Sequence, residues 1–143
     1  MRKIQYFILL AVMLSVGFVA KADKERVITF QELPQAAKEL IKTNFSGKAP
    51  MVVTVDLDDY EVYFESGEKI EFGKNGQWKE IVCKGTGIPA AIVPNQIKNQ
   101  VKKSYPSAKI VKIERDHRGY EVKLNNSIEI EFDKAFKVAG IDD

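Results

Sequence analysis

The chain contains a single histidine, His117, and a single cysteine, Cys83, and these are its best candidates for nucleophilic or metal chemistry. A thiolate–imidazole pair or a zinc site needs more ligands than one histidine and one cysteine provide. His117 could be a general base or a metal ligand, but the following Arg118-Gly119 predicts an exposed turn. Cys83 could be a nucleophile or a redox sensor, but its position after apolar residues is more typical of a small core side chain at a strand end.

The acidic sequence DLDD at Asp56–Asp59 is a second candidate site, for calcium. It lacks the spacing of a twelve-residue calcium loop and the glycine that such a loop requires. Aspartates are also common in tight hairpins, so a plain turn is the alternative. The serines fall in turns or helix ends without a base nearby. We therefore predict that the protein is not an enzyme and uses no cofactor or metal.

The first residues have the three parts of a secretory signal peptide. Arg2 and Lys3 precede an apolar run, Ile4 to Ala20, and the run ends in the small-residue site Ala20-Lys21-Ala22. A membrane anchor is the alternative, but the run falls short of the roughly 20 residues that a span needs. No cysteine follows it directly, which disfavours a lipoprotein. We predict a signal peptide at residues 1–22, cleavage near Ala22, a periplasmic or secreted protein, and no stable membrane insertion after cleavage.

Removal of this leader changes the charge balance. The full chain has 22 basic and 20 acidic residues, and the leader takes three of the basic ones, which leaves 19 against 20 and a net charge of −1. Nucleic-acid binding needs clustered, uncompensated Lys and Arg, so nucleic acid is excluded as a partner. One cysteine cannot form an intramolecular disulfide, so the fold must depend on its apolar core.

An internal repeat dominates the rest of the sequence. Leu33–Phe72 aligns with Val93–Phe132 without a gap, and ten of the forty pairs are identical, including the Tyr-Glu-Val and Ile-Glu-Phe triplets. The pattern predicts an α+β fold in which a helix plus a four-stranded antiparallel meander occurs twice in tandem. We expect residues 23–83 and 84–143 to act as one domain, 23–143, because each repeat alone is near the size limit for independent folding. The helices cover one face of the sheet or sheets, and the other face is open.

Apolar spacing and turn residues place the elements of each repeat. The predicted helices are Pro34 to about Asn44 and Pro94 to about Ser104, and a capping box at Thr29–Glu32 predicts a short turn before the first. The predicted strands are Met51–Leu57, Tyr60–Glu65, Lys69–Phe72, Trp78–Cys83, Ile110–Asp116, Tyr120–Leu124, Ile128–Phe132 and Phe136–Ile141. The short loops between them require antiparallel neighbours.

Strict alternation along the strands separates an apolar face from a polar one. The polar, open face is the predicted binding surface, with the candidate residues Tyr63, Trp78, Glu61, Glu65, Glu71, Glu80, Glu121, Lys123, Glu129 and Glu131. Exposed Tyr and Trp are enriched at binding centres, and an acidic face opposite lysine-rich helices would steer a partner. The alternative is a solvated sheet whose glutamates maintain solubility and whose Trp78 caps the edge of the core.

The whole predicted mature chain resembles the PepSY-like exported proteins of Gram-negative gut bacteria. The similarity is carried by the leucine–proline helix start, the turn FGKNGQW, the segment CKG before the second repeat and the SYP that ends the second helix. The resemblance implies the tandem fold of the beta-lactamase inhibitor protein and a non-enzymatic periplasmic module with binding or inhibition as its activity. The second repeat departs from the first at FDKAF, which reads as two residues shorter than FGKNGQW and aligns Phe136 with Trp78.

Two functions therefore remain open. The first is an exported protein-binding module, an inhibitor among the options, whose open acidic face receives another envelope or secreted protein. The alternative is a small-ligand or carbohydrate binder that stacks its ligand on Tyr63 and Trp78. Thermal-shift screening separates them, because only a ligand that prefers the native state raises the melting temperature.

Overall fold

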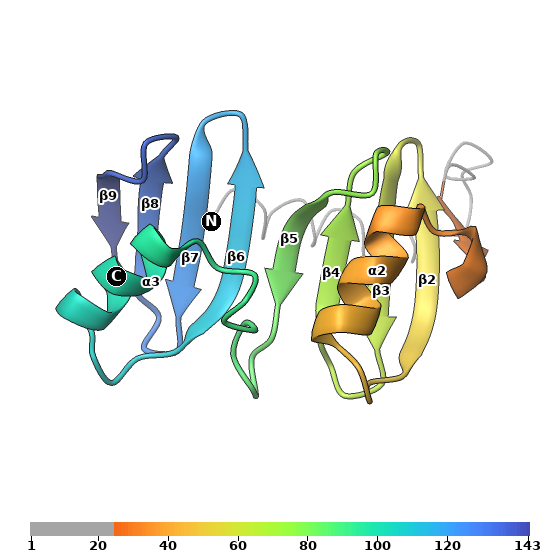
Figure 1. The fold of residues 1–143 in the computed structure, drawn as a ribbon, viewed down its shortest axis with the longest axis horizontal. Coiled ribbons are helices and arrows are strands. Elements are labelled where there is room, and N and C mark those ends of the chain that lie inside the picture. The colour runs from red at the N-terminus through yellow and green to blue at the C-terminus, as the bar shows by residue number, and fades with distance from the viewer. Residues whose placement is uncertain (1–24) are drawn as a thin grey trace, which may run out of the picture.

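The structure is a computed structural model, and it describes residues 25–143. It confirms an α+β fold, and it shows nine antiparallel strands in one sheet in the order β1 to β9 (Figure 1). The strands are β1 (Glu25–Ile28), β2 (Pro50–Asp56), β3 (Asp59–Phe64), β4 (Lys69–Phe72), β5 (Trp78–Val82), β6 (Ile110–Asp116), β7 (Gly119–Leu124), β8 (Glu129–Asp133) and β9 (Val138–Asp142). The helices are η2 (Phe30–Glu32), α2 (Gln35–Asn44) and α3 (Asn95–Ser104). The predicted signal peptide lies outside the described residues.

Helices α2 and α3 begin directly after Pro34 and Pro94, as the sequence predicts. Proline suits this position because its missing N–H would have no partner in the first turn. Both helices lie on the same side of the sheet (Figure 1). Ile41 of α2 and Ile97 of α3 are buried against it. The helices therefore close one face of the sheet and leave the other uncovered by any described element.

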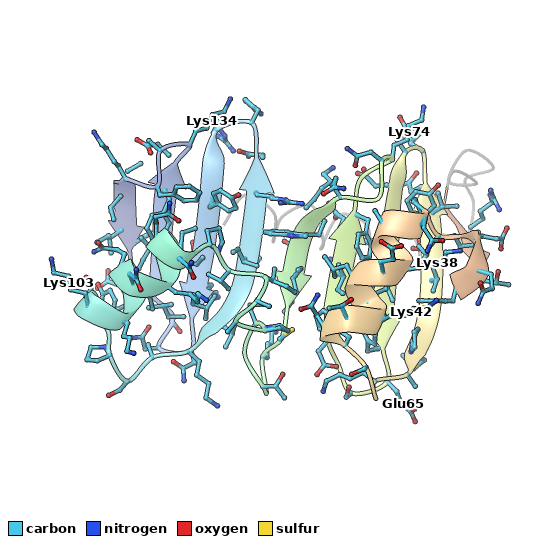
Figure 2. All side chains as sticks on the ribbon, viewed as in Figure 1. Lys38, Lys42, Glu65, Lys74, Lys103 and Lys134 are labelled. Atoms are coloured by element: carbon cyan, nitrogen blue, oxygen red, sulfur yellow. The ribbon has the colours of Figure 1, made fainter. Side chains whose placement is uncertain are left out.

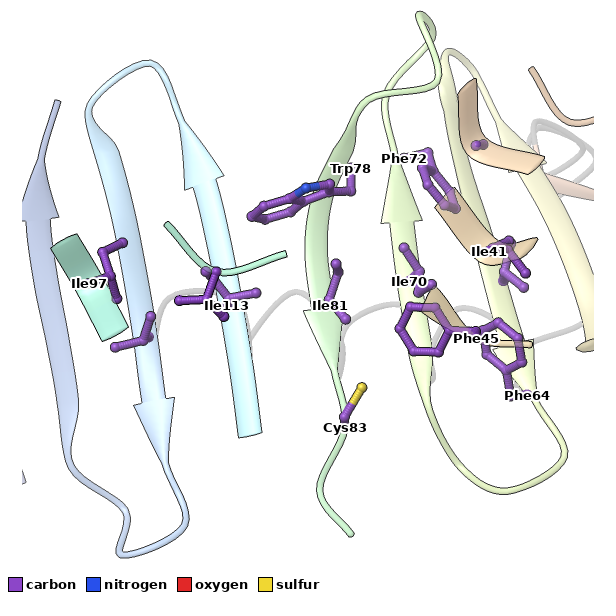
Figure 3. Close-up of a cluster of buried hydrophobic side chains, with 14 of the residues drawn as sticks. Ile41, Phe45, Phe64, Ile70, Phe72, Trp78, Ile81, Cys83, Ile97 and Ile113 are labelled. Carbon is purple, nitrogen blue, oxygen red and sulfur yellow. The ribbon is translucent and has the colours of Figure 1, made fainter. Parts of the chain in front are cut away.

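The pairing of β5 with β6 makes the sheet continuous. Ile81 lies directly opposite Ile113, and both side chains are fully buried. Figure 3 shows the two isoleucines on neighbouring strands within one apolar cluster that also contains Phe72 and Ile97. The segments before and after this pairing thus share a core as well as a sheet.

Strand β1 is the one element that the sequence did not predict. Its four residues pair with β2, and only Ile28 is buried. The short turn after it was predicted correctly: the Glu32 carboxylate accepts hydrogen bonds from the Thr29 backbone N–H at 2.7 Å and from the Thr29 hydroxyl at 3.1 Å. Four residues with two adjacent charges give no alternation to detect, which explains the miss.

The turn before β9 corrects the prediction that it is two residues shorter than the turn before β5. Asp133 N–H donates to the Lys137 carbonyl at 2.9 Å, just as Gly73 N–H donates to the Gln77 carbonyl at 2.9 Å. Both turns therefore have the same length, and β9 starts at Val138, two residues later than predicted.

Phe136 consequently occupies the position of Gly76, not that of Trp78. Both residues adopt positive φ, 63° for Phe136 and 81° for Gly76. A bulky residue is strained in this conformation. The Phe136 ring stacks on Tyr120 with the ring centroids 5.5 Å apart, a contact that offsets part of the strain.

Candidate binding face

Trp78 does not lie on the open face, contrary to the prediction. Its side chain is 6% exposed and belongs to the apolar core. The register between β4 and β5 shifts at this point: Trp78 lies opposite Phe72, whereas Glu80 lies opposite Glu71. The extra residue, Lys79, forms a bulge that reverses the alternation, so Trp78 turns to the helix side.

The Trp78 side chain closes the junction between β5 and β6. In Figure 3 it reaches from β5 towards β6. The Arg115 guanidinium lies 3.9 Å from the centroid of its ring, and Arg115 Nε donates to the Trp78 carbonyl at 2.7 Å. Tyr120 lies beyond, with ring centroids 6.5 Å apart. These contacts agree with the alternative that Trp78 caps the core, and they remove it from the candidate binding residues.

Six glutamates lie in register across the open face. Each is directly opposite the next on neighbouring strands, from β3 to β8. We call this set the glutamate row: Glu61, Glu71, Glu80, Glu114, Glu121 and Glu131. Glu114 was not among the predicted site residues, although its alternation with the buried Ile113 indicates an outward position. The row spans the β5–β6 junction and so joins both ends of the sheet into one surface.

Lysines beside the row neutralise its centre. Lys69 Nζ lies 3.3 Å from a carboxylate oxygen of Glu80 and 3.6 Å from one of Glu61. Lys112 Nζ lies 2.9 Å from Glu114 and 3.6 Å from Glu80. Like charges directly opposite one another destabilise a sheet, and these ion pairs offset that repulsion. Glu80, held between two lysines, is the most fully compensated member of the row.

Glu71 and Glu121 are less well compensated, although Lys79 Nζ lies 3.8 Å from a carboxylate oxygen of Glu71. Burial raises the pKa of Glu71 above its ordinary value, and the negative charge of Glu80 raises it further. Burial likewise raises the pKa of Glu121, followed by repulsion from Glu114 and Glu129. The folded protein therefore disfavours the ionised forms of Glu71 and Glu121.

This repulsion predicts that Glu121→Gln stabilises the protein at neutral pH. A raised folded-state pKa means that the ionised carboxylate opposes folding, and this cost disappears as the pH falls below the unfolded pKa of about 4.3. We expect the free energy of unfolding at pH 7 to rise by roughly 0.2–1 kcal/mol, the range of a cross-strand pair. Urea unfolding of wild type and variant should show no difference below about pH 4.

Glu65→Gln is the matched control, because Glu65 is exposed and lies just beyond β3. It should change the unfolding free energy little at either pH. A destabilised Glu121→Gln protein at pH 7, or a gain that persists unchanged at pH 4, would contradict the assigned repulsion.

The remaining predicted residues surround the row. Tyr63 and Lys123 lie two residues along their strands from Glu61 and Glu121, and Lys123 is opposite Glu129. The Tyr63 hydroxyl donates to Glu61 Oε2 at 2.6 Å, and burial, with this hydrogen bond, raises the pKa of the phenol. Within residues 25–143 the open face thus contains one aromatic side chain, the half-buried Tyr63, within an array of acidic and basic groups.

The catalytic and metal candidates do not come together. His117 is exposed in the β6–β7 turn, and Cys83 is 1% exposed. Burial raises the pKa of the Cys83 thiol to about 12, so the thiol stays protonated at neutral pH. Across residues 25–143, which include Asp56–Asp59, no group of three or more His, Cys, Asp and Glu side chains is placed to hold a metal ion. Nor is any helix in this range long and apolar enough to cross a membrane.

Comparison with known families accounts for this architecture. The model of a family described as "Putative beta-lactamase-inhibitor-like, PepSY-like" matches residues 19–62 and 58–139. The chain belongs to this PepSY-like family. The resemblance predicted from the sequence motifs is thereby confirmed. No protein among the curated ones matches the chain.

Three solved structures that are similar to this chain come from Bacteroides. One from B. thetaiotaomicron, described as a "putative calcium-regulated periplasmic protein", is 42% identical with a TM-score of 0.83, covering 85% of this chain and 99% of its own. A "putative periplasmic protein" from B. vulgatus is 44% identical with a TM-score of 0.83 and the same coverage. A second B. vulgatus protein, described as periplasmic and of unknown function, is 33% identical with a TM-score of 0.79, covering 83% and 99%.

Proposed function

We propose that this PepSY-like protein is an exported, non-enzymatic binding module whose glutamate row receives a basic surface of another envelope or secreted protein. The observation that carries the proposal is the register of six carboxylates across β3–β8. Such a row costs stability, because opposed like charges repel. A basic partner would relieve the repulsion between the glutamates, and this relief would contribute favourably to the free energy of binding.

Tyr63 is the anchor residue that the proposal places beside the row. Tyrosine combines a large apolar surface with a hydroxyl, and such residues dominate the energy of many interfaces. The alternative of a small-ligand or carbohydrate site has less support, since Trp78, its second stacking platform, is buried.

Besides the binding function, we infer a tandem organisation of the fold and export by a signal peptide. The order α2 then β2–β5, followed by α3 then β6–β9, supports a tandem of two helix-plus-four-strand units. The pairs Tyr60–Phe72 and Tyr120–Phe132, and the two regions matched by the family, support it too. Export by a signal peptide at residues 1–22 is supported by relatives that are described as periplasmic.

Capture from an envelope extract tests the binding proposal. We expect immobilised wild-type residues 23–143 to retain a basic protein that the double variant Glu71→Gln/Glu121→Gln loses, with the affinity at least about tenfold weaker, or 1.4 kcal/mol. The variant should be no less stable, because it removes repelling charges. Capture should also weaken with rising salt.

The matched control is Lys42→Gln/Lys103→Gln, which changes two exposed charges on the helix side (Figure 2). It should leave capture intact. Equal capture by wild type and the glutamate variant would reject the proposal. Adding calcium or a chelator to the same experiment is informative, because one relative is described as calcium-regulated. We expect capture to be the same with calcium and with the chelator, because no group of described side chains is placed to hold a metal ion.

A further inference from the structure

The outer edge of β9 resembles the edge of β5 that pairs with β6 in the same sheet. Val138 lies opposite Phe132 and Ile141 opposite Ile130, in the same way that Trp78 lies opposite Phe72 and Ile81 opposite Ile70. The two strands nevertheless differ in burial. Trp78 and Ile81 are 6% and 0% exposed, whereas Val138 and Ile141 are 40% and 58% exposed.

The difference follows from what lies next to each strand. β5 is followed in the sheet by β6, and Ile113 covers Ile81. Within residues 25–143, no strand pairs with the outer edge of β9 (Figure 1). Ile141 is thus an apolar residue on the helix-covered side of the sheet whose neighbouring strand is missing from the described chain.

The β9 edge also lacks most of the devices that block edge pairing. Strand edges are usually protected by charged side chains, proline or bulges. The opposite edge strand, β1, carries Glu25 and Arg26, whereas β9 has the sequence Val-Ala-Gly-Ile-Asp with a single charge at Asp142. The bulge at the start of β9 does not prevent pairing, because β5 has the same bulge and pairs with β6 through its last three residues.

The β5–β6 pairing indicates which residue types a strand next to β9 would need. There, Ile113 lies opposite Ile81 and Lys112 lies opposite Val82. On β9 the corresponding positions are Ile141 and Asp142. An antiparallel strand in this register would place an apolar residue against Ile141 and a basic residue against Asp142. A second copy that offered its own β9, with Ile141 against Ile141, would place Gly140 rather than a basic residue against Asp142.

We propose that the β9 edge accepts an extended segment of a partner protein, antiparallel, in which a basic residue precedes an apolar one. Backbone hydrogen bonds to the edge would supply affinity, and the pair of side chains opposite Asp142 and Ile141 would supply selectivity, as in other strand-addition complexes. This surface is distinct from the glutamate row, so the inference stands even if the open face captures nothing.

A synthetic peptide with the sequence of Lys109–Asp116, KIVKIERD, serves as the probe, because β6 fills the equivalent edge of β5. Fluorescence anisotropy with labelled peptide should show saturable binding to wild-type protein. Ile141→Lys should weaken it by about tenfold or more, since it replaces the apolar contact by a charge that repels the basic residue. Amide shifts in a two-dimensional NMR titration should concentrate on β8 and β9.

The control variant is Met51→Lys, which makes the same kind of substitution at a 64% exposed residue of β2 and should bind the peptide like wild type. A peptide with proline in place of the central isoleucine, KIVKPERD, should not bind, because proline cannot complete a strand ladder. Equal affinity of wild type and Ile141→Lys, or NMR shifts away from β8 and β9, would overturn the proposal. So would a concentration-dependent dimer in sedimentation that Ile141→Lys abolishes, because the occupant would then be a second copy.

Discussion

Gly119→Ala is expected to destabilise the protein by about 3 kcal/mol or more, at the upper end of strain and overpacking effects. Gly119 begins β7 with φ at 141°, a conformation that L side chains rarely adopt. An added Cβ would clash with the carbonyl oxygen of Phe132 and would lie 2.8 Å from the carbonyl carbon of Asp133. Both are backbone atoms of β8, so relief of the clash requires disruption of the β7–β8 pairing. Urea unfolding monitored by circular dichroism measures the loss.

Alanine substitutions at two other glycines distinguish the effect of the clash from that of backbone strain. Gly85→Ala should leave stability nearly unchanged, because no atom lies within 4 Å of the added Cβ. Gly67→Ala tests backbone strain alone, since its φ is 101° but the space around it is open. We expect an intermediate loss of about 1 kcal/mol there. Gly119→Ala with the stability of Gly85→Ala would show that the β7–β8 contact is not as close as described.

The pairing at the start of each strand explains why β7 begins with a glycine, Gly119, whereas β3 begins with Asp59. Asp59 takes the corresponding position at the start of β3, where β4 pairs only from Tyr60 onward. β8 extends one residue further, so Asp133 lies opposite Gly119. A side chain is thus tolerated at residue 59 and excluded at residue 119.

Ile81→Ala is expected to cost about 2–5 kcal/mol, the range for removing large aliphatic side chains from a core. Ile81 is fully buried between β4 and β6, opposite Ile70 and Ile113. The cavity would lie at the centre of the sheet, where both helix-covered segments meet, so neither segment could close around it alone. Thermal or urea unfolding should remain a single transition with a lower midpoint.

Ile141→Ala is the matched control, because Ile141 holds the corresponding position on β9 and is 58% exposed. Its expected cost is within about 0.5 kcal/mol. Two separate unfolding transitions in Ile81→Ala would contradict a shared core, and similar losses in both variants would contradict the difference in burial.

The helices were predictable because their signals are local. Pro34 and Pro94 mark the starts, and both helices lie within one residue of the predicted bounds. Strands bounded by tight turns were also placed well. The start of β9 was predicted too early because an aromatic residue such as Phe136 is typical of a strand, whereas its left-handed backbone depends on a turn geometry that composition does not reveal.

The candidate site was predictable in part. Alternation placed the glutamates on the open face, since it needs only the period of a strand. Trp78 was assigned to the wrong face because the bulge residue Lys79 takes Trp78, which precedes it, out of the alternation that Glu80 and Ile81 follow. The register that aligns Glu80 with Glu114 was not readable, since it depends on the pairing of β5 with a strand that follows an entire helix. Pairing across long connections is set by the assembled core rather than by local sequence.

The consecutive order of the nine strands bears on how the chain folds. Every strand pairs only with its predecessor and successor, so each new hairpin can add to the one before. Among the described strands, two connections are long: the one from β1 to β2, which contains α2, and the longer one from β5 to β6, which contains α3. Low sequence separation between contacts favours rapid folding. We therefore expect closure of the β5–β6 loop to be the slow step, because it spans the longest connection between neighbouring strands.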